Sequence, residues 1–389
     1  PYTTLFRSAM NQKEVRELKR RFRPDKNAIS RIYGCFVDPN RRIISYLDES
    51  LGLMPEDEVE KYLNLLKKTL SGTLGKNLID IVFSTQQVVD SPEHRLLTRL
   101  RDTQLEDAEV RQEFYDKVIA SLSMDDSRYL ILLAHDSYDV PYRGKDDEVQ
   151  ADASDQVFSY LVCCVCPVKE RRGELGYFPG DNEFHSCSSQ VVSAPEVGFL
   201  FPAFDGRATN LYNALYYARK PDGLHQELID AVFHTEPPMS AADQRLAFET
   251  ALAESLGDTC SVEVVQAIHE QLRERLEIHK ESRDPEPPSI SQGELGAILA
   301  EAGAAQEQIQ VFRDQCDQQF GRAPLNPANL IDSRRFEVKT GQATVNIAPE
   351  HSGLLETQVI NGRRYLLVPM DGTVEVNGFA LEGEGKSDG

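Results

Sequence analysis

Residues 129–134 read Tyr-Leu-Ile-Leu-Leu-Ala, and residues 157–168 read Val-Phe-Ser-Tyr-Leu-Val-Cys-Cys-Val-Cys-Pro-Val. The first stretch is a continuous apolar run, typical of a strand that is buried on both faces of a sheet, and the second resembles its partner. A residue in such a strand contacts the core whichever way its side chain points, so polar residues are excluded from it. We therefore expect the two runs to pair at the centre of a sheet.

Periodicity elsewhere in the first half predicts both helices and strands. A helix should begin at Pro55, because Glu56, Asp57 and Glu58 place negative charge at its positive end, and apolar residues then recur every three or four positions. Proline at position 202 should restrict its strand to an edge or a bulge. The remaining expected strands are 32–37, 43–47, 78–83 and 199–204, and the remaining expected helices are 12–22, one from 91, one over 110–122, and 209–219.

The pattern changes after residue 235. Four amphipathic helical segments follow one another, and from Phe336 the apolar residues alternate with polar ones, with Asn361-Gly362 as a hairpin turn. The sequence thus predicts an α+β protein: a mixed or antiparallel sheet flanked by helices, a helical middle region and a small C-terminal β module. The expected divisions are an α+β domain at 10–235, a helical region at 236–325, a β module at 326–381 and a disordered tail at 382–389.

The first nine residues are set aside from this fold prediction. Pro1 to Ser8 read like the translation of a common sequencing-adapter oligonucleotide. We expect residues 1–9 to be an artefact without ordered structure, and Met10 to be the natural start.

Charge is distributed unevenly along the chain. The 389 residues carry a net charge of −21, yet the segment from Met10 to Arg42 holds ten basic and only four acidic residues. An acidic body repels polyanions, whereas a local basic segment attracts them. This asymmetry makes the segment 13–42 the leading candidate for contact with a polyanion.

Four cations in this segment share the spacing of one helical face. Arg16, Lys19, Arg20 and Arg23 recur at intervals of three or four residues, which is the spacing of neighbours on a helix surface. One interpretation is that they bind the phosphates of a nucleic acid. The other is a solvated helix that docks on the acidic body.

Polar residues also follow two predicted strands. His135 and Asp136 come after the run 129–134, and Asp205 and Arg207 come after 199–204. Such groups could form a site for acid–base catalysis or anion binding. The alternative is local: a turn at Asp205-Gly206 and an ion pair.

A metal site is not expected. Cys163 and Cys166 have the spacing of a zinc-binding pair, with His185 and Cys187 further on. However, residues three apart in a strand point to opposite faces of the sheet. We therefore predict that these cysteines pack as small hydrophobic residues, and that the protein has neither a metal nor another cofactor.

Function follows only in outline from these patterns. Since no complete catalytic motif is present, the leading hypothesis is a non-catalytic binding or interaction protein. Its partner would be nucleic acid or another protein. The alternative is an enzyme that uses His135, Asp136, Asp205 and Arg207.

No apolar run is long enough to span a membrane, no leader follows Met10 and the seven cysteines form no disulfide framework, so we expect a cytoplasmic protein.

From Met10 onward the chain resembles a family of uncharacterised bacterial proteins, domain of unknown function 4317. The stretches that carry the resemblance are Asn11 to Val15, Arg31 to Val37 and Phe201 to Arg207. The resemblance implies no activity. The order of an α/β half, a helical middle and a terminal β module is also similar to that of the bacterial nucleoid-associated protein family, a likeness of architecture alone.

Overall fold

The computed structural model describes residues 10–124, 127–143, 149–321, 324–370, 374–376 and 379–381. The expected artefact at 1–9 and the expected tail at 382–389 lie outside these residues. The chain forms two compact units, one of residues 1–243 with 285–287 and one of residues 244–284 with 288–389. Each unit is described by itself.

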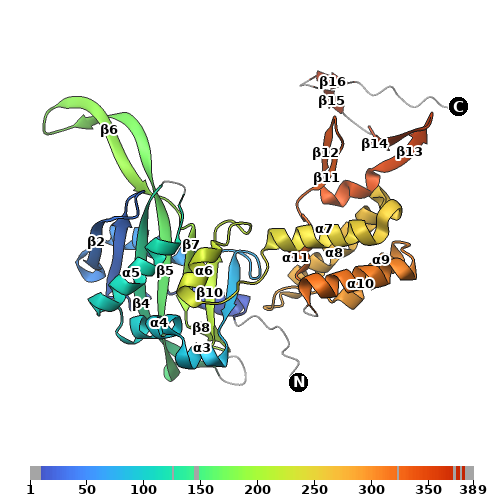
Figure 1. The fold of residues 1–389 in the computed structure, drawn as a ribbon. Helices are drawn as coiled ribbons and strands as arrows, with labels where there is room; N and C mark the ends of the chain where they lie inside the picture. Colours follow the sequence, from blue (N-terminus) through green and yellow to red (C-terminus); the bar gives the residue numbers. More distant parts are fainter. Residues whose placement is uncertain are drawn as a thin grey trace. The chain divides into compact units, whose positions relative to one another are not determined.

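The first unit is built on an eight-stranded sheet in which every pair of neighbouring strands is antiparallel. Seven strands follow the order β2-β1-β4-β5-β7-β10-β3, and β6 pairs with the outer part of β5. This arrangement, with helices against the sheet, confirms the predicted α+β class (Figure 1). The strands are β1 (Arg31–Val37), β2 (Ile43–Ser50), β3 (Leu78–Val82), β4 (Arg128–Arg143), β5 (Val149–Phe178), β6 (Glu183–Val192), β7 (Val197–Phe201) and β10 (Asn213–Ala218).

The two apolar runs pair at the centre of this sheet, as predicted. Ala134 lies opposite Val162 and Tyr129 opposite Pro167. Alternate residues reach two separate cores: Ile131 and Leu133 lie in one, whereas Leu132 and Ala134 lie in the other. Because both cores require apolar side chains, the run has no polar residue.

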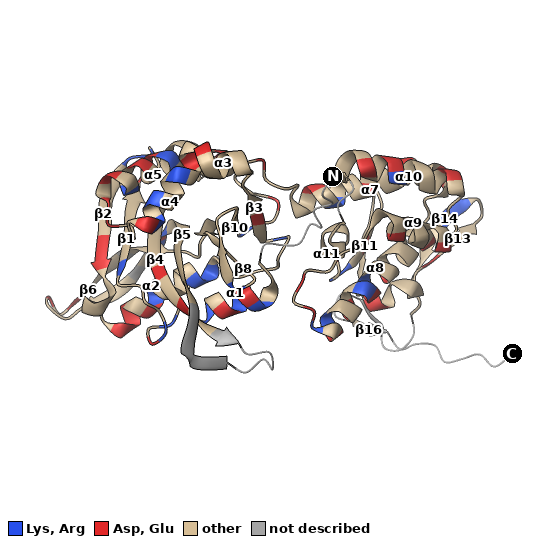
Figure 2. Ribbon diagram, turned by 90° about the horizontal axis from the view of Figure 1, so that it is seen from below, with Lys and Arg blue, Asp and Glu red and all other residues tan. Residues whose placement is uncertain are grey.

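Helices cover both faces of the sheet. The helices α4 (Pro92–Asp102), α5 (Ala108–Ser121) and α6 (Gln226–Phe233) pack on one face, with the short α3 (Thr85–Asp90) beside them. On the other face lie α1 (Gln12–Lys19) and α2 (Glu56–Lys68). Figure 2 shows the two layers on opposite sides of the strands. The apolar stripe predicted after Pro55 is the buried side of α2.

The prediction of a helix over 209–219 is wrong. Residues Ala208–Asn210 form β9, which pairs with β8 (Ala203–Asp205), and after a turn at 211–212 residues Asn213–Ala218 form β10. Tyr216 reaches one core and Leu215 the other, so the segment has the two-sided burial of a central strand. The strand β10 pairs with β7 on one edge and with β3 on the other. This pairing makes the segment a strand, and the local spacing of its apolar residues does not reveal such tertiary partners.

The second unit contains helices followed by small hairpins. Its helices surround a core that includes Leu272, Leu299 and Phe312. In the β13–β14 hairpin Asn361 and Gly362 both have positive φ angles, 52° and 77°, as the predicted two-residue turn requires. The elements are α7 (Ala241–Leu256), α8 (Val262–Ser282), α9 (Gln292–Glu301), α10 (Gln306–Phe320), α11 (Pro327–Leu330), β11 (Phe336–Lys339), β12 (Thr344–Ile347), β13 (Glu356–Ile360), β14 (Arg363–Leu367), β15 (Val374–Val376) and β16 (Phe379–Leu381).

The closest backbone approach in the sheet provides a test of the register between β1 and β4. A Cβ atom added at Gly34 would overlap the carbonyl oxygen of Ile131, and neither backbone can move without breaking the ladder. We expect Gly34→Ala to lower the free energy of unfolding by about 1–3 kcal/mol, measured by urea denaturation. Gly52→Ala, which meets nothing within 4 Å, is the control and should change it by less than about 0.5 kcal/mol. Equal effects of the two substitutions would contradict this register.

Candidate anion-binding cleft

The helix α1 begins at a reciprocal capping box. The side-chain oxygen of Asn11 accepts hydrogen bonds from the backbone N–H groups of Lys13 and Glu14, at 2.9 and 3.1 Å. In return the Glu14 carboxylate accepts the N–H of Asn11 at 2.8 Å. This arrangement satisfies backbone donors that an uncapped helix end leaves free. Val15 and Leu18 then bury the inner side of the helix in the core.

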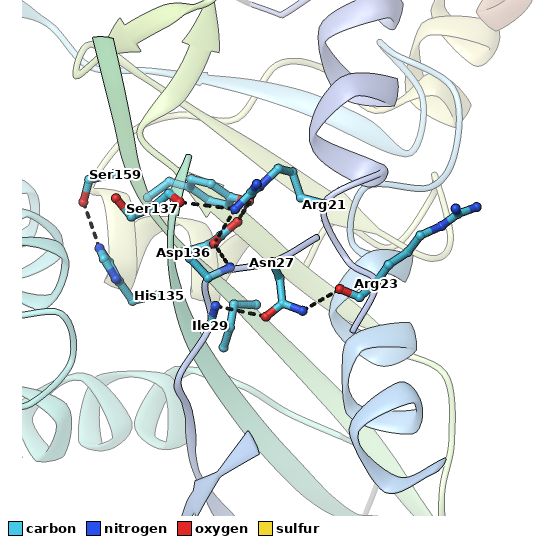
Figure 3. A network of polar contacts seen from close by, with 10 residues as sticks. Arg21, Arg23, Asn27, Ile29, His135, Asp136, Ser137 and Ser159 are labelled. Atoms are coloured by element: carbon cyan, nitrogen blue, oxygen red, sulfur yellow. Dashed lines mark hydrogen bonds and ion pairs between the residues drawn. The ribbon is translucent and has the colours of Figure 1, made fainter. Parts of the chain in front are cut away.

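A buried ion pair holds the end of this helical segment against the sheet (Figure 3). Arg21 donates Nε and Nη2 to the two carboxylate oxygens of Asp136, at 3.0 and 2.9 Å. The same carboxylate accepts the Ala28 N–H at 2.8 Å and the Tyr160 hydroxyl at 2.7 Å. Burial lowers the pKa of Arg21, but the hydrogen bond and charge of Asp136 outweigh it and raise the pKa overall. Asp136, which is 2% exposed, is thus engaged by four donors.

A second ion pair joins α1 to the loop between β8 and β9. Arg207 Nη2 lies 2.9 Å from Glu17 Oε1, which also accepts the Tyr138 hydroxyl at 2.8 Å. The backbone N–H of Arg207 donates to Glu14 at 3.2 Å. The guanidinium of Arg21 lies over the Tyr138 ring, 4.6 Å from its centroid, so Tyr138 connects the two ion pairs. Burial and the hydrogen bond to Glu17 raise the pKa of Tyr138 to about 12.

The strand-end residues that the sequence singled out do not gather at one point. Asp136 and Arg207 both hold α1, on the same face of the sheet. His135 points to the opposite face, where its Nε2 lies 2.8 Å from the Ser159 hydroxyl, and burial lowers its pKa. Asp205 accepts a hydrogen bond from the Asn210 side chain at 3.1 Å, the local contact expected of a turn. Arg207 pairs with Glu17 rather than with Asp205.

The outer side of α1 forms one wall of a cleft, and the end of α2 forms the other. The cleft is open to solvent, has a volume of about 210 Å³ and is lined by Arg16, Lys19, Arg20, Arg23 and Lys67. The three arginines are exposed, and the two lysines are half-buried. In the part of the chain that the structure describes, none of these five cations takes part in an ion pair. The four cations predicted from their helical spacing therefore do share a surface, and Lys67 is an addition that sequence spacing could not identify.

Two of the cleft's cations, one from each wall, lie close enough to influence each other. Burial, and then the charge of Lys67, lower the pKa of Lys19, so two cations are held close together. The carboxyl end of a helix normally carries partial negative charge on its free carbonyls. At the end of α2, however, the Thr69 hydroxyl donates to Leu66 O at 2.6 Å and the Ser71 hydroxyl to Lys67 O at 3.3 Å. Two carbonyl oxygens at this helix end are therefore engaged by side-chain donors.

Other cations of the basic segment have different partners. Arg21 faces inward to Asp136, Arg31 pairs with Asp48 of β2 at 2.5 Å, and Arg41 donates to the Ala120 carbonyl at 2.8 Å. The net charge of the segment thus overstates the charge that a ligand could reach. The cations that a ligand could reach lie on the outer side of α1 and the turn after it.

The cysteines of β5 divide between the two cores, as strand alternation predicts. Cys163 lies in one core, and Cys164 and Cys166 lie in the other. Cys187 lies on β6 and is exposed. Among the described residues no three His, Cys, Asp or Glu side chains gather as a metal site would require.

The fold and the cleft define an α+β protein with a basic surface on an acidic chain. The chain belongs to the family described as domain of unknown function (DUF4317), whose model matches residues 10–379. No curated protein matches it, and the likeness to the nucleoid-associated family is not supported by the comparison. None of the helices in the described ranges is long and apolar enough for a membrane span.

The ion pair at Asp136 can be tested by removing its charge. Asp136→Asn leaves the half-buried Arg21, 17% exposed, beside a neutral amide, and losing a charge-assisted hydrogen-bonded pair of this kind costs about 2–3 kcal/mol. We expect the free energy of unfolding, measured by urea denaturation, to fall by that amount. Asp139→Asn, an exposed position on the same strand, is the control and should leave stability nearly unchanged. A loss below about 1 kcal/mol for Asp136→Asn would contradict the structural role of the pair.

Proposed function

We propose that this protein is a non-catalytic binding protein whose basic cleft binds the phosphate backbone of a nucleic acid. The observation that carries the proposal is the cleft between α1 and α2, lined by five cations that have no carboxylate partners among the described residues. Arginine and lysine side chains are the groups that contact phosphates most often. Bound phosphates would relieve the repulsion between Lys19 and Lys67.

The size of the cleft favours contact with the backbone over recognition of bases. Pockets for small organic ligands enclose roughly 300–1,000 Å³, whereas this cleft encloses about 210 Å³. A phosphate group fits such a space, but a nucleoside would not be enclosed by it. Backbone contacts position a protein without reading sequence, so the proposal is for binding with little sequence preference.

The acidic charge of the rest of the chain implies that a nucleic acid would be attracted to the cleft and not to the whole surface. The net charge of −21 repels polyanions from most of the surface. A ligand would therefore be oriented by the cleft. A reducing, cytoplasmic location is part of the proposal, and it is supported by seven cysteines that are all free thiols in the structure.

The main test is retardation of duplex DNA in a gel at low salt. With five phosphate contacts the logarithm of the affinity should fall with the logarithm of salt concentration with a slope of about −4.5. Replacing the four cations of α1 and the turn that follows it by alanine should remove most of the binding; these are Arg16, Lys19, Arg20 and Arg23.

The matched control removes the same charge elsewhere. It replaces four exposed cations of the second unit by alanine, namely Arg334, Lys339, Arg363 and Arg364. This variant should bind as the wild type does. No retardation by the wild type, or equal losses in both variants, would refute the cleft as the nucleic-acid site and leave a protein partner as the alternative.

A single substitution on α2 distinguishes binding in the cleft from binding to the basic helix α1 alone. Lys67 lines the cleft from α2, whereas Lys68, its neighbour, is exposed and outside it. We expect Lys67→Ala to weaken binding and to reduce the salt slope by about 0.9, with Lys68→Ala close to wild type. Titrations of both variants at several salt concentrations measure this, and identical slopes would show that α1 binds without the cleft.

A further inference from the structure

The strand β6 and the outer part of β5 form a two-stranded ribbon that extends beyond the rest of the sheet (Figure 1). In the ribbon Tyr177 lies opposite Phe184, and Lys169 opposite Val191. Among the strands of the described sheet β6 pairs with β5 alone. Backbone groups on its other edge therefore point away from the other strands of the described sheet, and two-stranded ribbons are only marginally stable in water by themselves.

The free edge of β6 lacks the charges that protect the other free edges. The edge strand β2 carries Asp48 and Glu49, and the edge strand β3 carries Asp80 at its centre. The outer part of β5 begins with Lys169, Glu170 and Arg171. Charged residues on an edge strand prevent it from pairing with another chain. In β6 the only Asp, Glu, Lys or Arg is its first residue, Glu183, and it contains no proline.

One face of the ribbon is apolar and exposed. Leu175, Tyr177 and Phe184 are 77%, 51% and 67% exposed, and the rings of Tyr177 and Phe184 contact each other with centroids 5.3 Å apart. Because Tyr177 and Phe184 are directly opposite each other in the register, they lie on the same face. Leu175, two residues along β5, lies on that face as well.

We propose that β6 pairs with β6 of a second copy of this chain, antiparallel and centred on Cys187, to form a continuous four-stranded ribbon. This register is self-complementary: the single acid, Glu183, lies opposite Val191, and no two like charges face each other. The apolar faces of the two ribbons lie on the same side of the resulting sheet and join into one surface. The proposal does not depend on the proposed function.

The two-fold axis at Cys187 makes the pairing measurable. Directly opposite residues of an antiparallel pair have Cα atoms about 4.5 or 5.5 Å apart, depending on whether they exchange hydrogen bonds. Both separations lie within the range that a disulfide spans, about 4.4–6.8 Å. Cys187 is exposed, and it is the only fully exposed cysteine of the seven. Mild oxidation should therefore link two chains through Cys187, in the wild type and in Cys260→Ser but not in Cys187→Ser.

The decisive comparison uses two substitutions at the axis. Cys187→Ser keeps the position neutral, whereas Cys187→Asp places two carboxylates opposite each other. Since the side chain is exposed, neither change should affect folding, and circular dichroism checks this. Light scattering should give twice the chain mass for the wild type and Cys187→Ser, and a dimer dissociation constant at least about tenfold higher for Cys187→Asp.

Three results would overturn the proposal. The first is a wild-type mass of one chain at concentrations up to about 100 µM. The second is a dimer that Cys187→Asp leaves as tight as Cys187→Ser, since the chains would then associate through another surface. The third is a dimer in which oxidation does not link Cys187 to Cys187.

Discussion

The structure of the first unit depends on the buried carboxylate of Asp136. Four donors from three parts of the chain converge on it: two from Arg21, one from the backbone of Ala28 and one from Tyr160 of β5. A charged group is tolerated at 2% exposure only when it is paired and fully hydrogen-bonded. Apolar contacts are not directional, so they alone do not specify one position of α1 on the core. The four hydrogen bonds to Asp136 are directional and form in a single position of the chain. The ion pair thus fixes the position of α1 on the sheet, whatever its net effect on stability.

With the segment in this position, the acidic and the basic side chains of α1 and the turn after it point to opposite sides. The carboxylates of Glu14 and Glu17 turn inward, where they bind the backbone and side chain of Arg207. The cations at 16, 19, 20 and 23 turn outward and face Lys67 of α2. A helix of mixed charge therefore presents an almost purely positive side, on a chain whose net charge is −21. The structure shows the docked side of the segment, and its outer side is the surface that we propose binds a ligand.

Sequence patterns predicted what depends on neighbouring residues. The apolar run 129–134, the stripe of α2 and the turn at Asn361-Gly362 all follow from local spacing, and each was confirmed. The errors and omissions involve partners far along the chain. The segment of β10 has the local spacing of a helix, and its pairing with β3 joins residues more than 130 positions apart. The roles of Asp136 and Lys67 were missed for the same reason, since Asp136 meets Arg21 across 115 residues. A sequence shows that a carboxylate follows a strand, but not which cation reaches it.

The central claim is that α1 is held in place by Asp136, so that the cleft exists before a ligand arrives. The most direct measurement is the affinity of Asp136→Asn for duplex DNA, at a temperature where circular dichroism shows this variant to be folded. Asp136 is buried behind α1 and does not line the cleft, and its replacement removes one negative charge, which by itself would strengthen binding. The account predicts weaker binding, because the cations lose their fixed arrangement and a ligand must order them. Affinity equal to or greater than that of the wild type would contradict it, and would show that the cations of α1 act as an unstructured basic segment.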